Sequence, residues 1–161
     1  MNFSNLKLTA LVNGLSLLKI PLLAFVTPRV VELTDEKSEI KIGLGYRTKN
    51  HLRVMYFGSL AMGAELSIAL MAVDQIQKSG QKIDFLFKQF DSQFLKRAEG
   101  DVHFVCPEAA GVKDLIARSL ETNDRLEQKF QGYAYVPSIS PEPIMTYALT
   151  LSVKKRSKKK A

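Results

Sequence analysis

The sequence predicts an α+β domain in which a curved antiparallel sheet wraps around one long central helix. From Leu60 to Val73 every residue is apolar or small except Glu65, so the helix containing this segment is apolar on all sides and should be buried. Most of the remaining chain consists of short runs in which apolar and polar residues alternate, as they do in strands with one buried face. A single apolar helix is hidden from water only if such a sheet curls around it.

The N-terminal segment 6–26 is rich in leucine but is interrupted by Asn13, Lys19 and Pro21. No continuous apolar stretch therefore reaches the roughly 20 residues needed to span a bilayer, and no small-residue signal cleavage site follows. Apolar residues recur at helical spacing at Leu8, Leu11, Val12, Leu15 and Leu18. We expect an amphipathic helix that covers a core edge or a partner, with binding to a membrane interface as the alternative.

Past Pro28 the pattern changes to strands. Segments 30–34 and 39–46 flank a polar turn, which predicts a hairpin with one buried face. The central helix is expected from about residue 57 to 77, because Ser79-Gly80 is typical of a helix end.

The remaining chain is expected to form mostly strands. Segment 125–136 is one, and segment 110–120 is a short helical interruption. Three further strands are indicated by alternating apolar residues: Ile83, Phe85 and Phe87; Val102, Phe104 and Cys106; and Met145, Tyr147, Leu149, Leu151 and Val153. Together these elements predict one domain over residues 1–153, followed by a disordered basic tail at 154–161.

The charge distribution argues against a nucleic-acid-binding face. The net charge is +7, but six of the 23 basic residues lie in the segment 154–160. Without that tail the body is almost balanced, so a broad basic surface is not expected. We interpret the tail as a solvated terminus, the alternative being a loose contact with phosphates of a bound cofactor or of a membrane surface.

Metal, disulfide and serine-hydrolase chemistry all lack a sequence signal. The single cysteine, Cys106, alternates with apolar residues and is expected to be a buried core thiol. The only histidines are His51 and His103, which are too few for a recognisable metal site and resemble ordinary loop or sheet residues. No Gly-x-Ser-x-Gly elbow and no Gly-rich phosphate loop occur.

Glu65 is the strongest functional candidate. Burial disfavours the charged form of a carboxyl group and raises its pKa, and a poised carboxylate is what a general base or nucleophile requires. The alternative is a core carboxylate tied to a backbone amide or to an arginine.

The segment 50–65 resembles the active-site segment of hotdog-fold acyl-CoA thioesterases of the phenylacetate-pathway and 4-hydroxybenzoyl-CoA thioesterase type. Their pattern is an Asn or Gln, commonly His-Gly-Gly six to eight residues later, and an acid fifteen residues after the first polar residue. Asn50, Tyr56-Phe57-Gly58 and Glu65 stand at these separations. The whole chain also resembles an uncharacterised bacterial branch of that superfamily. The resemblance implies the hotdog fold.

The resemblance also implies a role for each residue of the motif. Glu65 would attack the thioester carbonyl or direct water at it, and Asn50 would orient that carboxylate or the water. The backbone N–H of Phe57 would polarise the carbonyl oxygen, helped by the positive end of the helix. Gly58 completes the motif. Tyr56 replaces a histidine and keeps a hydrogen-bonding tip, but it loses a group that titrates near neutral pH.

Each of these residues also has a purely structural interpretation. Asn50 suits a turn or a helix entry, and Gly58 could serve close packing alone. Tyr56 could be a core residue with a satisfied hydroxyl group.

Coenzyme A is expected only as part of the substrate, so no resident cofactor and no metal are predicted. Lys96 and Arg97 are the preferred contacts for its phosphates, and Arg118 and Lys129 are weaker candidates.

The predicted function is hydrolysis of an acyl-CoA thioester to free acid and CoA in the cytoplasm. In related hotdog proteins the acid and the carbonyl-polarising amide come from different subunits, which implies a homodimer or a dimer of dimers. A non-catalytic acyl-CoA or acyl-chain binding protein is the alternative. A hydratase or dehydratase comes third, because neither histidine has an acid at a persuasive spacing.

Overall fold

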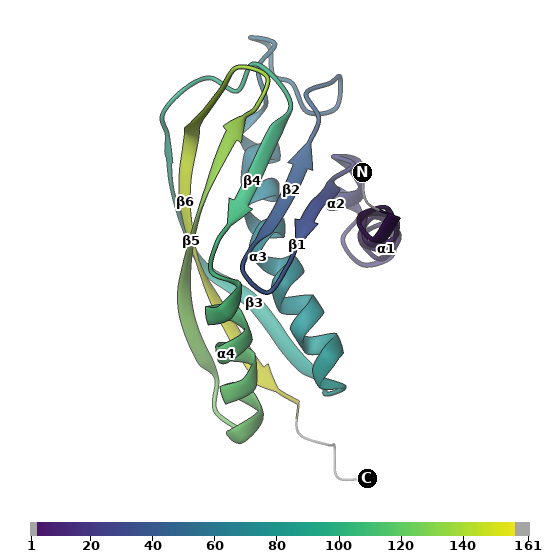
Figure 1. Ribbon diagram of the computed structural model, residues 1–161, viewed down its shortest axis with the longest axis vertical. Helices are drawn as coiled ribbons and strands as arrows, with labels where there is room; N and C mark the ends of the chain where they lie inside the picture. The colour runs from purple at the N-terminus through teal and green to yellow at the C-terminus, as the bar shows by residue number, and fades with distance from the viewer. Residues whose placement is uncertain (1–2, 157–161) are drawn as a thin grey trace.

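The computed structural model describes residues 3–156, with side chains for residues 5–14 and 17–156. The sheet has six antiparallel strands in the order β1-β2-β4-β5-β6-β3. It is curved, and one long helix, α3 (Phe57–Ser79), lies against it (Figure 1). The strands are β1 (Arg29–Leu33), β2 (Ser38–Ile42), β3 (Ile83–Phe94), β4 (Val102–Cys106), β5 (Leu126–Val136) and β6 (Ser140–Lys155). The other helices are α1 (Phe3–Lys19), α2 (Pro21–Phe25) and α4 (Ala109–Glu121). The predicted arrangement of a sheet around a central helix is confirmed.

The central helix begins at Phe57, as predicted, and ends two residues later than predicted, at Ser79. Gly80 follows in the left-handed conformation, with φ 64°, which glycine adopts without steric penalty. By length and composition α3 could cross a membrane, but most of its apolar stretch is buried inside the fold. Its apolar character is that of a core helix.

The sheet approaches α3 most closely at Gly63. A Cβ atom at this residue would lie 2.3 Å from the ring of Phe104, a side chain with no exposed surface. Real atoms do not come this close, so only glycine allows β4 to pack here. The prediction that small residues let the sheet approach the helix is confirmed at this position.

A buried chain of hydrogen bonds ties the middle of α3 to three strands. The Ser67 and Tyr147 hydroxyl oxygens lie 2.8 Å apart, and the Tyr147 hydroxyl group also lies 3.1 Å from the Val105 carbonyl oxygen, to which it donates. On the other side, the Ser38 hydroxyl group donates to the Ser67 carbonyl oxygen. Satisfied polar groups in a core fix one arrangement of their elements, and here they fix the register of α3.

The hairpin prediction is correct in kind but too long. β2 ends at Ile42 rather than at Tyr46, and segment 43–56 is a loop. The Thr48 hydroxyl group donates to the Gly43 carbonyl oxygen at 2.7 Å, and the Asp101 carboxylate accepts the Leu44 N–H at 2.9 Å. These bonds turn the chain away from the sheet. Tyr46, expected on the buried face, is 91% exposed.

The N-terminal helix covers the free edge of β1. Asn5, Thr9 and Asn13 recur every four residues on one face of α1, and all three bond to the backbone around β1. Thr9 accepts the Val30 N–H at 2.9 Å, and the side-chain amide of Asn13 donates to the Pro28 carbonyl oxygen at 2.9 Å. The helix thereby satisfies edge groups that would otherwise attract another strand.

The apolar spacing of α1 predicts its packing only in part. Leu8 and Val12 pack against a buried cluster that α3, β1 and β2 share with α2. Leu11 and Leu18 do not cover the core edge, because they are 46% and 83% exposed, so for them a partner or a membrane interface stays a prediction. The Leu15 side chain lies outside the described residues.

The alternating strands after α3 are confirmed. All five predicted apolar residues of β6, from Met145 to Val153, are buried. β6 continues to Lys155, so Lys154 and Lys155 belong to the sheet rather than to the tail expected from residue 154. Residues 157–161 lie outside the described residues, and the disorder expected for the tail stays a prediction.

We expect Gly63→Ala to lower the free energy of unfolding by about 1–3 kcal/mol. The added methyl group overpacks the core against Phe104, which outweighs the gain of up to about 1 kcal/mol from removing a helical glycine. Gly14→Ala in α1 is the matched control, because a Cβ there meets nothing within 4 Å. Urea unfolding of both variants measures the difference. Equal free energies of unfolding for Gly63→Ala and the wild type would show that the core accommodates the added methyl group beside Phe104.

Candidate active site

Glu65 lies on the one stripe of α3 that is only partly covered by the fold. Gly58, Ala61, Met62 and Ala69 share this stripe at helical spacing and are half-buried, as Glu65 is. Among the described residues, no hydrogen bond or ion pair engages the Glu65 carboxylate. Burial raises the pKa of Glu65 above its ordinary value. The interpretation as a core carboxylate held by an amide or an arginine therefore finds no such partner.

The same helix starts without a side-chain cap. Tyr56 is the capping residue, in extended conformation with φ −67° and ψ 141°, and its side chain makes no capping bond. Within the described residues, no acceptor meets the N–H groups of Phe57 and Gly58. These two amides point out of the helix N-terminus, where the helix dipole favours negative charge.

The side chains around this helix start are exposed aromatic rings. Tyr56 and Phe57 are 54% and 56% exposed, so the interpretation of Tyr56 as a core residue is wrong. The Phe57 ring contacts Phe94 of β3 edge to face, with centroids 5.7 Å apart. Gly58 lies beneath Tyr56, since a Cβ there would approach the Tyr56 ring to 2.6 Å. Gly58 thus lets Tyr56 fold back over the first turn of the helix.

Asn50 holds a tight turn in the loop before α3. Its side-chain oxygen accepts the N–H groups of Leu52 at 2.9 Å and Val54 at 3.3 Å, and Arg53 takes the left-handed conformation with φ 63°. This is the turn role that the sequence left open. The structure gives no hydrogen bond between Asn50 and Glu65, both of which are described, so a role in orienting the carboxylate stays a prediction.

Lys96 and Arg97 line a pocket of about 350 Å³ with the β5–β6 turn. The Met55 N–H donates to the Ala98 carbonyl oxygen at 2.9 Å, which joins this loop to the chain just before α3. Lys96 forms an ion pair with Glu142. Arg97 is exposed and, within the described part of the chain, has no ion-pair partner. Arg97 is therefore the better candidate for a phosphate.

The two weaker phosphate candidates are already paired. Lys129 Nζ lies 2.6 Å from the Asp91 carboxylate, and Arg118 Nε lies 2.7 Å from the Asp114 carboxylate. Neither cation is as accessible to a phosphate group as Arg97.

A polar cluster that the sequence did not predict lies on the opposite face of the sheet. The Glu39 carboxylate accepts from His103 Nδ1 at 2.6 Å and from the Tyr135 hydroxyl group at 3.1 Å. The His103 bond is the main cause that lowers the pKa of Glu39. The neighbouring residues Ile40 and Phe104 point into the core toward α3, so this cluster faces away from Glu65.

His103 therefore does have an acid partner, contrary to the expectation from sequence spacing. Glu39 and His103 are far apart in sequence and meet only through the pairing of β2 with β4. An acid–histidine pair on the side of the sheet remote from α3 does not bring a histidine to Glu65.

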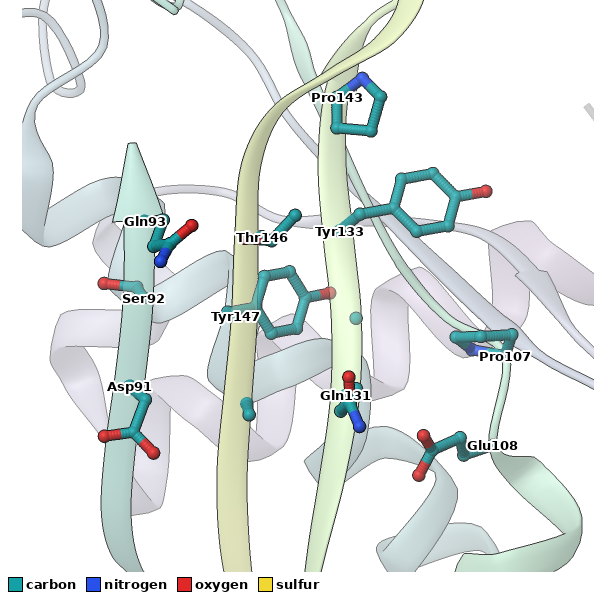
Figure 2. Close-up of a pocket in the computed structure, with 12 residues that line it drawn as sticks. Asp91, Ser92, Gln93, Pro107, Glu108, Gln131, Tyr133, Pro143, Thr146 and Tyr147 are labelled. Carbon is teal, nitrogen blue, oxygen red and sulfur yellow. The ribbon is translucent and has the colours of Figure 1, made fainter. Parts of the chain in front are cut away.

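A second pocket, of about 650 Å³, lies over β3, β5 and β6 on the face away from α3. Figure 2 shows Asp91, Thr146 and Gln131 on successive strands, with Glu108 at the far side. None of the predicted site residues lines this pocket. Thr146 alternates with the inward-facing Met145 and Tyr147, which explains why the pocket is separated from the core helix.

Among the described residues, the structure provides the geometry of neither a metal site nor a nucleophilic cysteine. Within residues 3–156, no group of three His, Cys, Asp or Glu side chains could hold a metal ion. Cys106 is buried, as predicted, and burial raises the pKa of its thiol to about 12, so the nucleophilic thiolate is scarce at neutral pH.

We expect Glu65→Gln to be more stable than the wild type at pH 7. A raised pKa means that the folded protein binds this proton more tightly than the unfolded chain does. The free energy of unfolding therefore falls as the pH rises from the ordinary value of 4.5 through the raised pKa. Glu65→Gln has no carboxyl group to titrate, so its free energy of unfolding does not fall in this range. Its stability advantage over the wild type should therefore vanish below pH 4.5.

Urea unfolding at several pH values measures this difference. Glu99→Gln, at an exposed residue, is the control and should change stability little at any pH. A Glu65→Gln variant that is less stable than the wild type at pH 7 would mean that the carboxylate has a stabilising partner.

The structure resembles solved proteins of the hotdog thioesterase fold. A protein of unknown function from Chlorobaculum tepidum matches with a TM-score of 0.79 at 11% identity, covering 94% of this chain and 97% of that one. A thioesterase from Haemophilus influenzae matches with a TM-score of 0.68 at 12% identity, covering 93% and 92%. These likenesses confirm the predicted hotdog fold.

Two solved variants of one Staphylococcus aureus protein also match. The first is called a thioesterase enzyme, with a TM-score of 0.63 at 12% identity, covering 83% of this chain and 98% of that one. The second has a TM-score of 0.61 at 14% identity, covering 84% and 99%. One variant replaces a glutamine and the other a glutamate fifteen residues later.

Comparison with curated proteins finds no similar sequence. The model of one protein family, described as "Domain of unknown function (DUF4442)", matches residues 9–122. This match spans α3, the loop before it and the Glu65 stripe, and it covers most of the 161 residues. The chain therefore belongs to the DUF4442 family, and its structure gives that family a hotdog fold.

Proposed function

We propose that the protein is a thioesterase that hydrolyses an acyl-CoA thioester to a free acid and CoA, with Glu65 as the reacting carboxylate. The observation that carries this proposal is a half-buried carboxylate without a partner, on the open stripe of a helix whose first amides are also free. A core carboxylate kept solely for stability would be paired. An unpaired one with a raised pKa fits a general base or nucleophile.

The reaction needs a carboxylate and an oxyanion site. Ionised Glu65 takes a proton from water while the water oxygen attacks the thioester carbonyl, or it attacks the carbonyl itself to form an anhydride that water then cleaves. In both routes the carbonyl oxygen becomes negative and the C–S bond breaks to release the CoA thiolate. The N–H groups of Phe57 and Gly58 suit that negative oxygen.

The acid and the amides are poorly placed to serve one thioester within a single chain. Eight residues separate Phe57 from Glu65, which is a rise of about 12 Å along α3. The amides point toward the helix N-terminus, so the carbonyl oxygen would lie beyond Phe57 and still farther from the carboxylate. This distance favours a site in which Glu65 of one copy faces the helix start of a second.

The free edge of the sheet supports such a homodimer. α1 covers β1 at one edge, whereas β3 at the other edge pairs, among the described strands, with β6 alone. β3 is 12 residues long and exposes Leu86, Phe90 and Phe94 by 50%, 36% and 47%. Long apolar edge strands attract another strand. Pairing of β3 with β3 of a second copy would extend the sheet and bring the partner's chain beside Phe57, which contacts Phe94.

The motif spacing gives independent support. The residues replaced in the two Staphylococcus aureus variants are separated by fifteen positions, the separation between Asn50 and Glu65. The substrate class rests on Arg97, an exposed cation beside a pocket near the start of α3, which suits a phosphate of CoA.

A non-catalytic acyl-CoA binding protein is the second candidate. Tyr56 and Phe57 occupy positions where the similar thioesterases commonly have His and Gly, and both rings stand at the start of α3. A thiol-release assay over a panel of acyl-CoA esters separates the two functions, because a binder saturates without releasing free CoA.

We expect Glu65→Gln and Phe57→Pro each to lower kcat by about 100-fold or more while the fold is kept. Proline removes the Phe57 N–H, and it is tolerated at the first helical residue after the extended Tyr56. Phe57→Ala is the matched control, because it removes the ring but keeps the amide. Thiol release by each purified variant gives kcat.

Mixing the two inactive variants tests the two-subunit site. Reassociation from a denatured equal mixture yields about half heterodimers, each with one intact site, so about a quarter of wild-type activity should return. No recovery, with heterodimers present, would place both groups in one chain. Wild-type kcat in Glu65→Gln would refute the proposed chemistry itself.

For Arg97→Ala we expect the KM for acyl-CoA to rise about ten-fold or more with little change in kcat, because the phosphates bind alike in the ground and transition states. The KM for an acyl-pantetheine thioester, which has no nucleotide phosphates, should not change. Arg29→Ala, at an exposed residue on β1, serves as control. An equal rise in KM for both substrates would argue against a phosphate contact.

A further inference from the structure

α1 presents its polar stripe to the protein and an apolar face to solvent. Asn5, Thr9 and Asn13 point at β1 and bond to its backbone. On the outward side, Leu6 and Leu17 are 49% and 66% exposed, in addition to Leu11 and Leu18. Figure 1 shows α1 standing beside β1, outside the sheet. Only Leu8 and Val12 of α1 pack inward, beside this polar stripe, because the edge of β1 needs the polar groups.

The apolar surface continues onto α2 and its neighbouring loop. Leu22 and Phe25 are 62% and 53% exposed, and Ile20 between the helices is 51% exposed. The Arg47 side chain donates to the Phe25 carbonyl oxygen at 3.3 Å and lies over the Phe25 ring, 5.7 Å from its centroid. Together the exposed apolar residues of α1 and α2 form what we term the outer leucine face: Leu6, Leu11, Leu17, Leu18, Ile20, Leu22 and Phe25.

The segment that carries this face contains charges of one sign. Residues 1–31 contain no Asp or Glu, and their charged residues are Lys7, Lys19 and Arg29. The adjoining loop adds Arg47 and Lys49. Leucines flanked by Lys and Arg without carboxylates are typical of helices that lie in the interface of an anionic bilayer.

A second copy of the chain is a poor occupant of the same face. Self-association there would bring like charges of two copies together, since residues 1–31 carry cations and no carboxylate. The homodimer proposed above uses the β3 edge, at the opposite side of the sheet, and does not need this face. An anionic surface offers both the apolar layer and the complementary charge.

We propose that the outer leucine face docks on the surface of an anionic lipid bilayer, with α1 and α2 lying in the interface and the sheet standing above it. This docking is independent of the proposed hydrolase activity. It differs from membrane spanning, because α3, the helix long enough to cross, is enclosed by the sheet.

The absence of tryptophan from the sequence permits a direct test on the full-length protein. Leu18→Trp places a single fluorophore on the outer leucine face, and Ile139→Trp places one in the β5–β6 turn, at a 60% exposed residue away from both sheet edges, as the matched control. With vesicles of phosphatidylcholine and phosphatidylglycerol, we expect a blue shift for Leu18→Trp and none for Ile139→Trp. Phosphatidylcholine vesicles alone should give a much weaker response.

Vesicle co-sedimentation then measures the contribution of the leucines. The double variant Leu17→Gln, Leu18→Gln should partition at least about ten-fold more weakly, because two leucines lose their apolar environment. Ile139→Gln, at an exposed apolar residue of the β5–β6 turn, should bind within about two-fold of wild type. Thermal unfolding verifies that the variants are folded, as expected for exposed positions.

Three results would overturn the proposal. The first is wild-type partitioning of the double variant. The second is binding that is lost on deletion of 157–161 but retained by the double variant, which would assign it to the basic tail. The third is failure to bind vesicles together with a smaller oligomer for the double variant in sedimentation velocity, which would make a second copy the occupant.

Discussion

The need to bury α3 on nearly all sides governs the rest of the structure. An apolar helix of 23 residues inside one sheet requires the strands to curve and to approach the helix closely. Gly63 makes the closest approach possible, and the Ser67–Tyr147 hydroxyl pair fixes the helix rotation that goes with it. Once that rotation is set, the stripe left uncovered carries Glu65. The position of the candidate base is thus a consequence of core packing.

One edge strand of the sheet is covered and the other is open, and each edge creates an exposed surface. At β1 polar side chains of α1 bond to the free backbone groups, and Leu6, Leu11, Leu17 and Leu18 face outward. At β3 no described element covers the edge, and Phe94 contacts Phe57 at the start of α3. One sheet therefore offers an apolar face rimmed by cations at one end and an open strand at the other. The covered edge at β1 and the open edge at β3 therefore determine which surfaces the fold offers to its proposed partners, a lipid bilayer and a second copy.

The sequence predicts local periodicity well and long-range pairing poorly. The bounds of α3 and the inward residues of β6 follow from the spacing of apolar residues, and Glu65 stands out because its neighbours are apolar. The loop at 43–56 depends on Asp101, which is distant in sequence and accepts the Leu44 N–H. The Glu39–His103 contact likewise requires the β2–β4 register. Apolar spacing marked the leucines of α1, but not the direction in which they face.

Glu65 illustrates why a functional residue conflicts with local stability. Every other residue between Leu60 and Val73 favours burial, whereas burial penalises the Glu65 carboxylate and no described group compensates it. Natural cores place such a group only where something else requires it. The N–H groups of Phe57 and Gly58 have the opposite requirement. They have no acceptor among the described residues, and negative charge stabilises them. In the proposed reaction Glu65 becomes neutral when it takes the proton of the attacking water, and the carbonyl oxygen that becomes negative in the same step meets the amides of the second copy. One step would therefore relieve the buried charge and supply the free N–H groups with an acceptor.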